Sequence, residues 1–367
     1  MAEPLKNIYS EYFFEGFATA IQQSIPAFNK TGFLASIFDD EWPNKELKQR
    51  MRHITLCLKP HLPSDYASMI KVVLNIIKQL RKNNLNEQSF EWMFLPEFVE
   101  LYGMEDMKTS IAAFEKITQF VSCEFAVRPF IIKYPKQMMA QILVWSKHDN
   151  HNVRRFASEG CRPRLPWAMA LPTLKKNPNA ILPVLENLKN DPSEYVRRSV
   201  ANNLNDIAKD NPSVVIKIAK KWIGKSSETD KLVKHACRTL LKQGNTEVMP
   251  LFGFGSVEKI SIENIKILTP AIKIGGEVIF SFDLKNNSKA SILIRLEYGL
   301  YYQKANGTLS RKVFKISEKR YAENSSTAIS KKQSFKVITT RKLHLGLHQL
   351  TIIVNGVEFG KHDFELV

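Results

Sequence analysis

The residues with the clearest chemical potential lie in the string D-N-H-N-V-R-R-F-A-S-E-G-C-R-P-R-L-P-W at 149–167. Its small apolar side chains recur at helical spacing: Val153, Ala157 and Gly160. On a helix they form a stripe that packs against a neighbour, so Arg155, Glu159 and Arg162 are predicted on the opposite, outward face. Two guanidiniums would flank one carboxylate there. A carboxylate among fixed cations stays ionised even in a site that binds a polyanion.

The end of this string predicts a turn that carries an aromatic side chain. Pro163 and Pro166 stop the helix and place Arg164 and Trp167 beside its end. Two interpretations of Trp167 stay open. It is either a core residue that closes the helix end or a π-face for a cationic ligand.

Two further carboxylates stand in comparable strings. Glu124 lies in S-C-E-F-A-V-R-P (122–129), one turn before Arg128, and Asp206 ends A-N-N-L-N-D (201–206). Taken alone, each is better explained by a structural role, and Glu124 and Arg128 have the spacing of an intrahelical ion pair. If the three carboxylates converge on one groove, a functional site becomes the better explanation.

Helical spacing of apolar residues dominates the first 147 residues, and no strand-like alternation interrupts it. Helices are predicted at about 5–27, 31–38, 44–59, 64–82, 87–102, 107–120, 123–133 and 135–147. Proline and asparagine clusters separate them. This region is therefore predicted to be all-α.

A sequence repeat begins at about residue 149. Each copy starts with an acidic N-cap residue, which is followed by a valine, then by basic residues and then by small residues. Val153, Val196 and Val233 are 43 and 37 residues apart, a period typical of a HEAT-like solenoid of helix pairs. Equivalent positions of the stacked helices are predicted to line one surface: Arg155, Glu159 and Arg162; Arg198, Asn202 and Asn205; His235, Thr239 and Lys242. A ligand-binding face and a solvated outer face explain this polar surface about equally well.

The pattern changes near residue 250, where M-P-L-F-G-F-G-S (249–256) indicates a linker. Beyond it apolar residues alternate at period two, as in Val278, Phe280, Phe282 and Leu284; Ile292, Ile294, Leu296 and Tyr298; and Leu350, Ile352 and Val354. With turns such as N-G at 355–356, about seven strands predict an immunoglobulin-like sandwich. We therefore predict a helical-repeat domain at 1–254 and an all-β domain at 255–367.

The charge of the chain points to a polyanionic partner. Lys and Arg number 53 against 36 Asp and Glu, a net charge of +17, which favours nucleic acid over a membrane surface or simple solubility.

Four dispersed cysteines form no C-x-x-C pair, as expected in a reducing compartment. The H-x-x-H at His148 and His151 has no further ligands, so we expect no metal. No signal peptide or membrane span is recognisable, and we expect a cytoplasmic protein.

Three strings together resemble a known family. S-C-E-F-A-V-R-P, V-R-R-F-A-S-E-G-C-R-P-R-L-P-W-A and Y-V-R-R-S-V-A-N-N-L-N-D-I-A-K-D-N-P are similar to the AlkC group of the HEAT-like alkylpurine DNA glycosylases, to which AlkD is related. The second string is the most specific. The resemblance covers about residues 1–250, and the sandwich resembles the immunoglobulin-like domain found in a subset of that group.

The resemblance implies excision of cationic alkylated bases from duplex DNA, chiefly 3-methyladenine with 3-methylcytosine as a second candidate. Excision starts base excision repair and proceeds without base flipping. By matching positions, Glu159 would be the central catalytic residue, with Glu124, Asp206 and the lesion-contacting Trp167 around it. The DNA-binding residues are predicted to be Arg155, Arg162, Arg198, Arg154, Arg164, His235 and Lys242.

We expect a monofunctional enzyme that uses water, because no lysine stands among the predicted catalytic residues. No cofactor, metal or obligate protein partner is expected, and a monomer suffices. The basic sandwich would be a DNA clamp through 305–312, 330–333 and 339–342, although exposed lysines also protect sheet edges. The alternative function is a non-enzymatic HEAT-repeat scaffold that binds nucleic acid or an acidic protein. The three carboxylates would repel DNA phosphates and so lower the affinity of such a scaffold for DNA.

Overall fold

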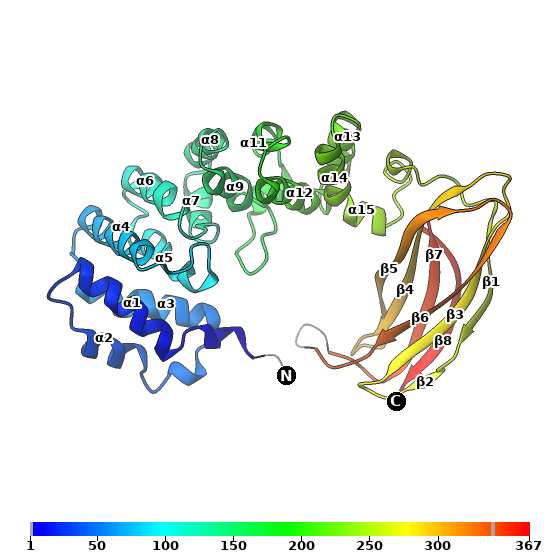
Figure 1. The fold of residues 1–367 in the computed structure, drawn as a ribbon, viewed down its shortest axis with the longest axis horizontal. Coiled ribbons are helices and arrows are strands. Elements are labelled where there is room, and N and C mark those ends of the chain that lie inside the picture. Colours follow the sequence, from blue (N-terminus) through cyan, green and yellow to red (C-terminus); the bar gives the residue numbers. More distant parts are fainter. Residues whose placement is uncertain (1–2, 339–341) are drawn as a thin grey trace. The chain divides into compact units, whose positions relative to one another are not determined.

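The computed structural model describes residues 3–338 and 342–367. The chain divides into two compact units, a helical unit of Met1–Val215 with Gly224–Ala236 and a second unit of Ile216–Ile223 with Cys237–Val367. The predicted fold class, a HEAT-like helical region followed by an immunoglobulin-like sandwich, is confirmed (Figure 1). The predicted boundary between residues 254 and 255 stays a prediction.

The α-helices are α1 Glu11–Ser24, α2 Lys30–Ile37, α3 Leu47–Leu58, α4 Tyr66–Lys82, α5 Glu97–Tyr102, α6 Met107–Ile117, α7 Val127–Lys133, α8 Pro135–Trp145, α9 His151–Gly160, α10 Pro172–Lys176, α11 Leu182–Leu188, α12 Glu194–Ala208, α13 Pro212–Trp222, α14 Ser227–Ala236 and α15 Arg238–Lys242. Short 3-10 helices are η1 Leu5–Ile8, η2 Trp42–Asn44, η3 Lys59–His61, η4 Phe90–Phe94 and η5 Pro250–Phe252. None of the helices in the described residues is long and apolar enough to cross a bilayer.

Two predicted helices are interrupted, each for a local reason. The segment 5–27 contains η1 and α1 as separate elements, because the Ser10 hydroxyl accepts a hydrogen bond from the Phe13 amide at 3.2 Å and starts a new helix. The segment 87–102 contains η4 and α5, separated at Pro96, whose ring cannot continue a helix interior. Predicting one continuous helix in each segment was wrong.

The helices that carry the predicted site belong to one layer of the helical unit. Figure 1 shows α7, α9 and α12 in one layer and α6, α8 and α11 in the other. α9 packs against α12, and α12 against α14. The predicted stripe of α9 is buried, and a Cβ on Gly160 would lie 2.9 Å from Val127 Cγ1. α9 therefore approaches α7 as closely as a glycine permits.

The strands of the second unit are β1 Ile260–Ile267, β2 Ala271–Ile272, β3 Glu277–Asn286, β4 Ile292–Gln303, β5 Leu309–Tyr321, β6 Ser325–Ser334, β7 Gly346–Val354 and β8 Val357–Leu366. They form one sheet in the order β1-β3-β6 and a second in the order β2-β8-β7-β4-β5. All pairings are antiparallel except that of β2 with β8.

The alternation read from the sequence defines the core between the sheets. The predicted inward residues of β3, β4 and β7 are buried, apart from the half-buried Ile292. Asn355 and Gly356 both have positive φ and form the predicted two-residue turn between β7 and β8. The loop prediction for 330–333 is wrong, because these residues lie within β6, and the prediction for 305–312 is right only up to residue 308, because β5 begins at Leu309. Of the loop at 339–342, residues 339–341 lie outside the described residues.

Candidate active site

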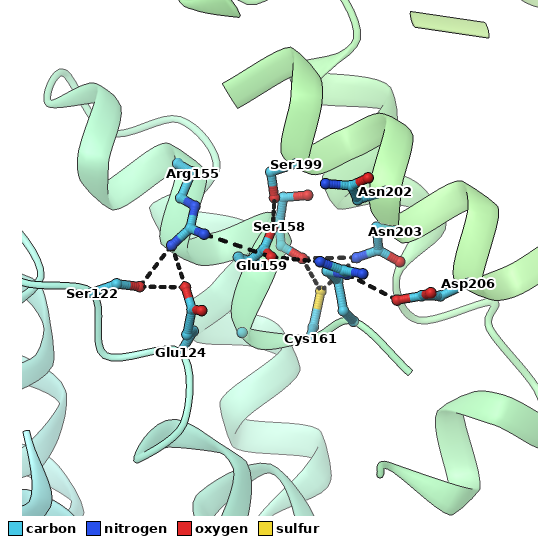
Figure 2. Close-up of polar contacts among 12 residues, drawn as sticks. Ser122, Glu124, Arg155, Ser158, Glu159, Cys161, Ser199, Asn202, Asn203 and Asp206 are labelled. Atoms are coloured by element: carbon cyan, nitrogen blue, oxygen red, sulfur yellow. Dashed lines mark hydrogen bonds and ion pairs between the residues drawn. The ribbon is translucent and has the colours of Figure 1, made fainter. Parts of the chain in front are cut away.

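Glu159 lies at the end of α9 and is buried, with 5% of its surface exposed. Its Oε1 accepts a hydrogen bond from Arg162 Nη1 at 2.6 Å and lies 3.5 Å from Arg155 Nη2. Its Oε2 accepts a hydrogen bond from Ser199 Oγ of α12 at 2.6 Å (Figure 2). The prediction that two guanidiniums flank this carboxylate is confirmed, but its placement on an outward face is wrong, because α12 packs over that side of α9.

The surroundings of Glu159 keep it ionised despite its burial. Burial by itself raises the pKa of this carboxyl. The positive charges of Arg155 and Arg162 and the hydrogen bonds from Ser199 and Arg162 act in the opposite direction and prevail. The pKa of Glu159 therefore lies below the ordinary value of a glutamate, and the side chain is a fixed negative charge at neutral pH.

Asp206 is the second buried carboxylate and comes from α12. It is 1% exposed, and its Oδ2 accepts a hydrogen bond from Arg162 Nε at 2.8 Å. Its Oδ1 accepts one from Lys209 Nζ at 3.0 Å. Arg162 lies beyond the end of α9 and turns back between Glu159 and Asp206, so a single guanidinium bridges the two repeats.

Glu124 is the third carboxylate and lies before α7 rather than within it. Its Oε2 accepts a hydrogen bond from Ser122 Oγ at 2.7 Å and pairs with Arg155 Nη1. Arg155 thus joins Glu124 to Glu159 (Figure 2). The predicted intrahelical pair of Glu124 with Arg128 is wrong, because the helix begins only at Val127.

Together these residues form one charged network that crosses three successive helical segments. In order it contains Glu124, Arg155, Glu159, Arg162, Asp206 and Lys209. Three carboxylates alternate with three cations. The three carboxylates thus lie in one network, as predicted, but Glu159 and Asp206 are buried, so an open groove around them and catalysis by these residues stay predictions.

Arg128 joins this region from α7 and has a structural position that the sequence did not reveal. It is fully buried, and its Nε donates to the Met169 carbonyl at 2.6 Å while Nη1 donates to the Gly160 carbonyl at 3.0 Å. Burial lowers the pKa of Arg128 to about 10, so the group remains protonated at neutral pH. It links the end of α9 to the segment that carries Trp167.

Trp167 is not a core residue, so that interpretation is wrong. Its surface is 62% exposed, and its backbone is left-handed, with φ of 62°. Such a φ is strained for a bulky residue and persists only when neighbours enforce it. Lys48 Nζ donates to the Trp167 carbonyl at 3.0 Å, and the Phe90 ring lies edge-on to the indole at 5.8 Å. The indole is therefore held out as an accessible aromatic face.

Of the other predicted DNA-binding arginines, Arg154 and Arg164 are paired with aspartates and Arg198 is largely exposed. Contact of these residues with DNA stays a prediction. Arg154 pairs with Asp191 at 2.6 Å and Arg164 with Asp210 at 2.6 Å, and the Arg154 pair is mostly buried between helices. Arg198 is the more accessible group, with 63% of its side chain exposed and Glu194 as its partner at 3.0 Å.

The third predicted repeat departs from the expected register. His235 lies on α14, and its Nε2 is 3.1 Å from Asn202 Oδ1 of α12, as expected for stacked equivalent positions. α14 ends at Ala236, and Thr239 and Lys242 lie on α15 in the second unit. Extending the stripe to those two residues was wrong. Asn205 is buried and does not line a surface.

Several contributing residues were missed from the sequence. Ser199 binds Glu159 from a helix 40 positions later, and Asn203 Nδ2 donates to the Ser158 carbonyl at 2.8 Å. The Tyr195 ring lies 4.9 Å from the guanidinium carbon of Arg155. Each occupies a polar position of the second repeat. The repeat pattern could have identified them as neighbours of α9, but not their individual partners.

Comparison with known proteins agrees with this architecture. A HEAT repeat family matches residues 181–210, and the family described as "Uncharacterised protein YhaZ, C-terminal Ig-like domain" matches residues 261–367. The uncharacterized protein YhaZ of Bacillus subtilis (strain 168) is 40% identical over 362 residues, 99% of either chain. The alkylpurine DNA glycosylase AlkC of Pseudomonas fluorescens, solved bound to DNA containing an abasic site analog, superposes with a TM-score of 0.92 at 34% identity over 100% of both chains.

Fold and site define a helical-repeat protein with an immunoglobulin-like domain and a buried row of carboxylates among cations. The chain belongs to the AlkC family of alkylpurine DNA glycosylases, as the sequence resemblance indicated.

Proposed function

We propose that this protein is a DNA glycosylase that hydrolyses the N-glycosidic bond of cationic alkylated bases in duplex DNA. Its first substrate is 3-methyladenine, and 3-methylcytosine is the second candidate. The observation that best supports this proposal is the ionised, buried Glu159, which is linked through Arg162 to Asp206. This network lies in a chain that matches the AlkC structure over its whole length. Excision without base flipping is carried over from the family resemblance.

The proposed chemistry needs fixed negative charge more than it needs a strong acid. Alkylation makes the base a cationic leaving group, so the bond breaks without prior protonation. The sugar develops oxocarbenium character, which adjacent carboxylates stabilise while they orient the attacking water. Glu159 and Asp206 supply this charge in the proposal, and the exposed Trp167 stacks against the lesion nucleotide.

The carboxylates become accessible to DNA through exchange of ion pairs. In the protein alone Arg155 and Arg162 cover Glu159, and Arg162 also covers Asp206. DNA phosphates compete for guanidiniums, which bind phosphate in a bidentate manner. Transfer of either guanidinium toward the DNA backbone would uncover a carboxylate beside the sugar. The same cations then serve both the resting network and the grip on double-stranded DNA.

We propose hydrolysis by water, and hence monofunctional activity without a lysine nucleophile. The lysine nearest to the predicted catalytic carboxylates in the network is Lys209, which lies 3.0 Å from Asp206. In the proposal Lys209 is a partner of Asp206, to which its Nζ donates a hydrogen bond, and not a nucleophile. The proposal extends to a monomer that acts on DNA in the cytoplasm.

The test is incubation of the full-length protein with methylated genomic DNA, followed by chromatography of the released bases. We expect free 3-methyladenine from the wild type and a loss of release in Glu159→Gln. Glu105→Gln, a change in a side chain that is 86% exposed, is the matched control and should release base normally. Tight DNA binding without release by the wild type would instead support the non-enzymatic scaffold.

A further inference from the structure

A pocket of about 500 Å³ lies beside the charged network in the helical unit. Its walls come from α3, from the η4–α5 region, from the segment before α7 and from the residues that follow Trp167. Ser122 connects the pocket with the charged network. It lines the pocket, and its Oγ donates a hydrogen bond to Glu124 Oε2 and accepts one from Arg155 Nη1, each at 2.7 Å. Ala168, the residue after Trp167, lines the pocket as well. The pocket therefore adjoins the place where a base would be released.

The apolar part of the lining suits a flat ring. It includes Met51, Met93, Phe125 and Met169. Methionine side chains adapt to the outline of an aromatic ligand and make favourable contacts with its edge and face. A concave, mostly apolar pocket of this volume is the usual form of a small-molecule site.

The polar part of the lining combines two carboxylates with cationic donors. Glu97 is 8% exposed, yet its contacts are long: Thr55 Oγ1 lies at 3.4 Å and Arg52 Nε at 3.8 Å. Arg52 Nη2 lies 3.4 Å from Glu100 Oε1. Charge-assisted hydrogen bonds are normally shorter, at about 2.7–2.9 Å. Both carboxylates can therefore accept stronger hydrogen bonds from a ligand than the protein gives them.

The charge of Glu97 is poorly compensated in the protein alone. Burial raises the pKa of Glu97 to about 7, although Arg52 opposes the shift. A buried carboxyl that is so weakly stabilised by its neighbours is typical of a functional position. Its preferred partner is a group that donates N–H hydrogen bonds.

These features fit a free purine base better than a nucleotide. Free 3-methyladenine offers a flat ring, an exocyclic amino group that can donate two N–H hydrogen bonds to Glu97 and Glu100, and ring nitrogens that accept hydrogen bonds from Lys48 or Arg52. A phosphate attached to the base would leave both carboxylates without an N–H donor and would have to bind Lys45, Lys48 or Arg52 instead. We propose that this pocket binds the purine base after its bond to the sugar has been cleaved. The inference rests on the proposed function and adds a product site to it.

The experiment uses the full-length protein without DNA and measures binding of free 3-methyladenine by calorimetry, with adenosine monophosphate as a second probe. Leu56 lines the pocket and is 50% exposed, so Leu56→Trp fills the pocket without disturbing the core. We expect this change to weaken binding by about tenfold or more, and the monophosphate to bind about tenfold more weakly than the base. Val144→Trp, on the 63% exposed Val144 of α8, should bind the base like the wild type.

Three results would overturn the product site. One is absence of saturable binding of the free base, and another is equal affinity in Leu56→Trp. The third is a monophosphate that binds more tightly than the base. The release assay on methylated DNA separates this proposal from the glycosylase assignment. Base release without free-base binding rejects the pocket alone, whereas free-base binding without any release rejects the role as a product site.

Discussion

Glu159 keeps its charge inside the protein because two guanidiniums and a hydroxyl group take the place of water around it. The balance is local: Glu124, Glu159 and Asp206 are matched by Arg155, Arg162 and Lys209. Breaking a buried pair by removal of one partner is costly, since the other charge stays buried. The network is therefore both a stabilising element and, in our proposal, the source of the catalytic charge.

The depressed pKa of Glu159 predicts how activity and stability depend on pH. Its charge stabilises the fold at any pH above the ordinary glutamate pKa of about 4.3. That contribution is lost only as the pH falls further, through the lower pKa of the folded state. Single-turnover base release at saturating protein should therefore stay constant from about pH 8 down to about pH 5. If the rate of base release instead falls at low pH with an apparent pKa between about 5 and 7, the group that controls the rate is not Glu159 with its depressed pKa.

At the scale of elements, the site depends on the close packing of α7, α9 and α12. Gly160 leaves no room for a side chain against Val127, whose β-branched side chain is fully buried. Gly160→Ala should push α9 away from α7 and destabilise the protein by about 1–3 kcal/mol, seen as a lower Tm. Ala157→Gly, one turn earlier on the same buried stripe, removes a methyl group instead of adding one and should cost about 1–2 kcal/mol through lower helix propensity and a small cavity. An unchanged Tm in Gly160→Ala would show that the helices can separate freely.

The sequence predicted the elements better than it predicted their contacts. Periodicity identified α9, α12 and the alternating strands because each pattern repeats within one element. The partners of Glu159 depend on how two repeats stack, and a spacing of about 40 residues does not specify which side chain of α12 meets it. Likewise, the prolines after α9 predicted a turn but not the positive φ that exposes Trp167.

At the scale of the molecule, the net charge of +17 gives both units a basic character suited to a polyanion. If the immunoglobulin-like domain is a DNA clamp, deletion of residues 256–367 should weaken binding to duplex DNA. It should also flatten the dependence of log affinity on log salt by about 0.9 for every phosphate that this domain neutralises. Fluorescence anisotropy at several salt concentrations measures both. Circular dichroism of the truncated protein must first show intact helices, and an unchanged affinity and slope would then discard the clamp.

In our proposal, a fixed negative charge at Glu159 drives base release. The most direct measurement is the single-turnover rate of release from a duplex with one 3-methyladenine, alongside affinity for the same duplex carrying an abasic site analogue. Because Gln keeps the size of Glu159 but not its charge, we predict a rate at least about 100-fold lower in Glu159→Gln. DNA affinity should match the wild type within about threefold, since the guanidiniums remain. A rate within about threefold of the wild type would contradict the account.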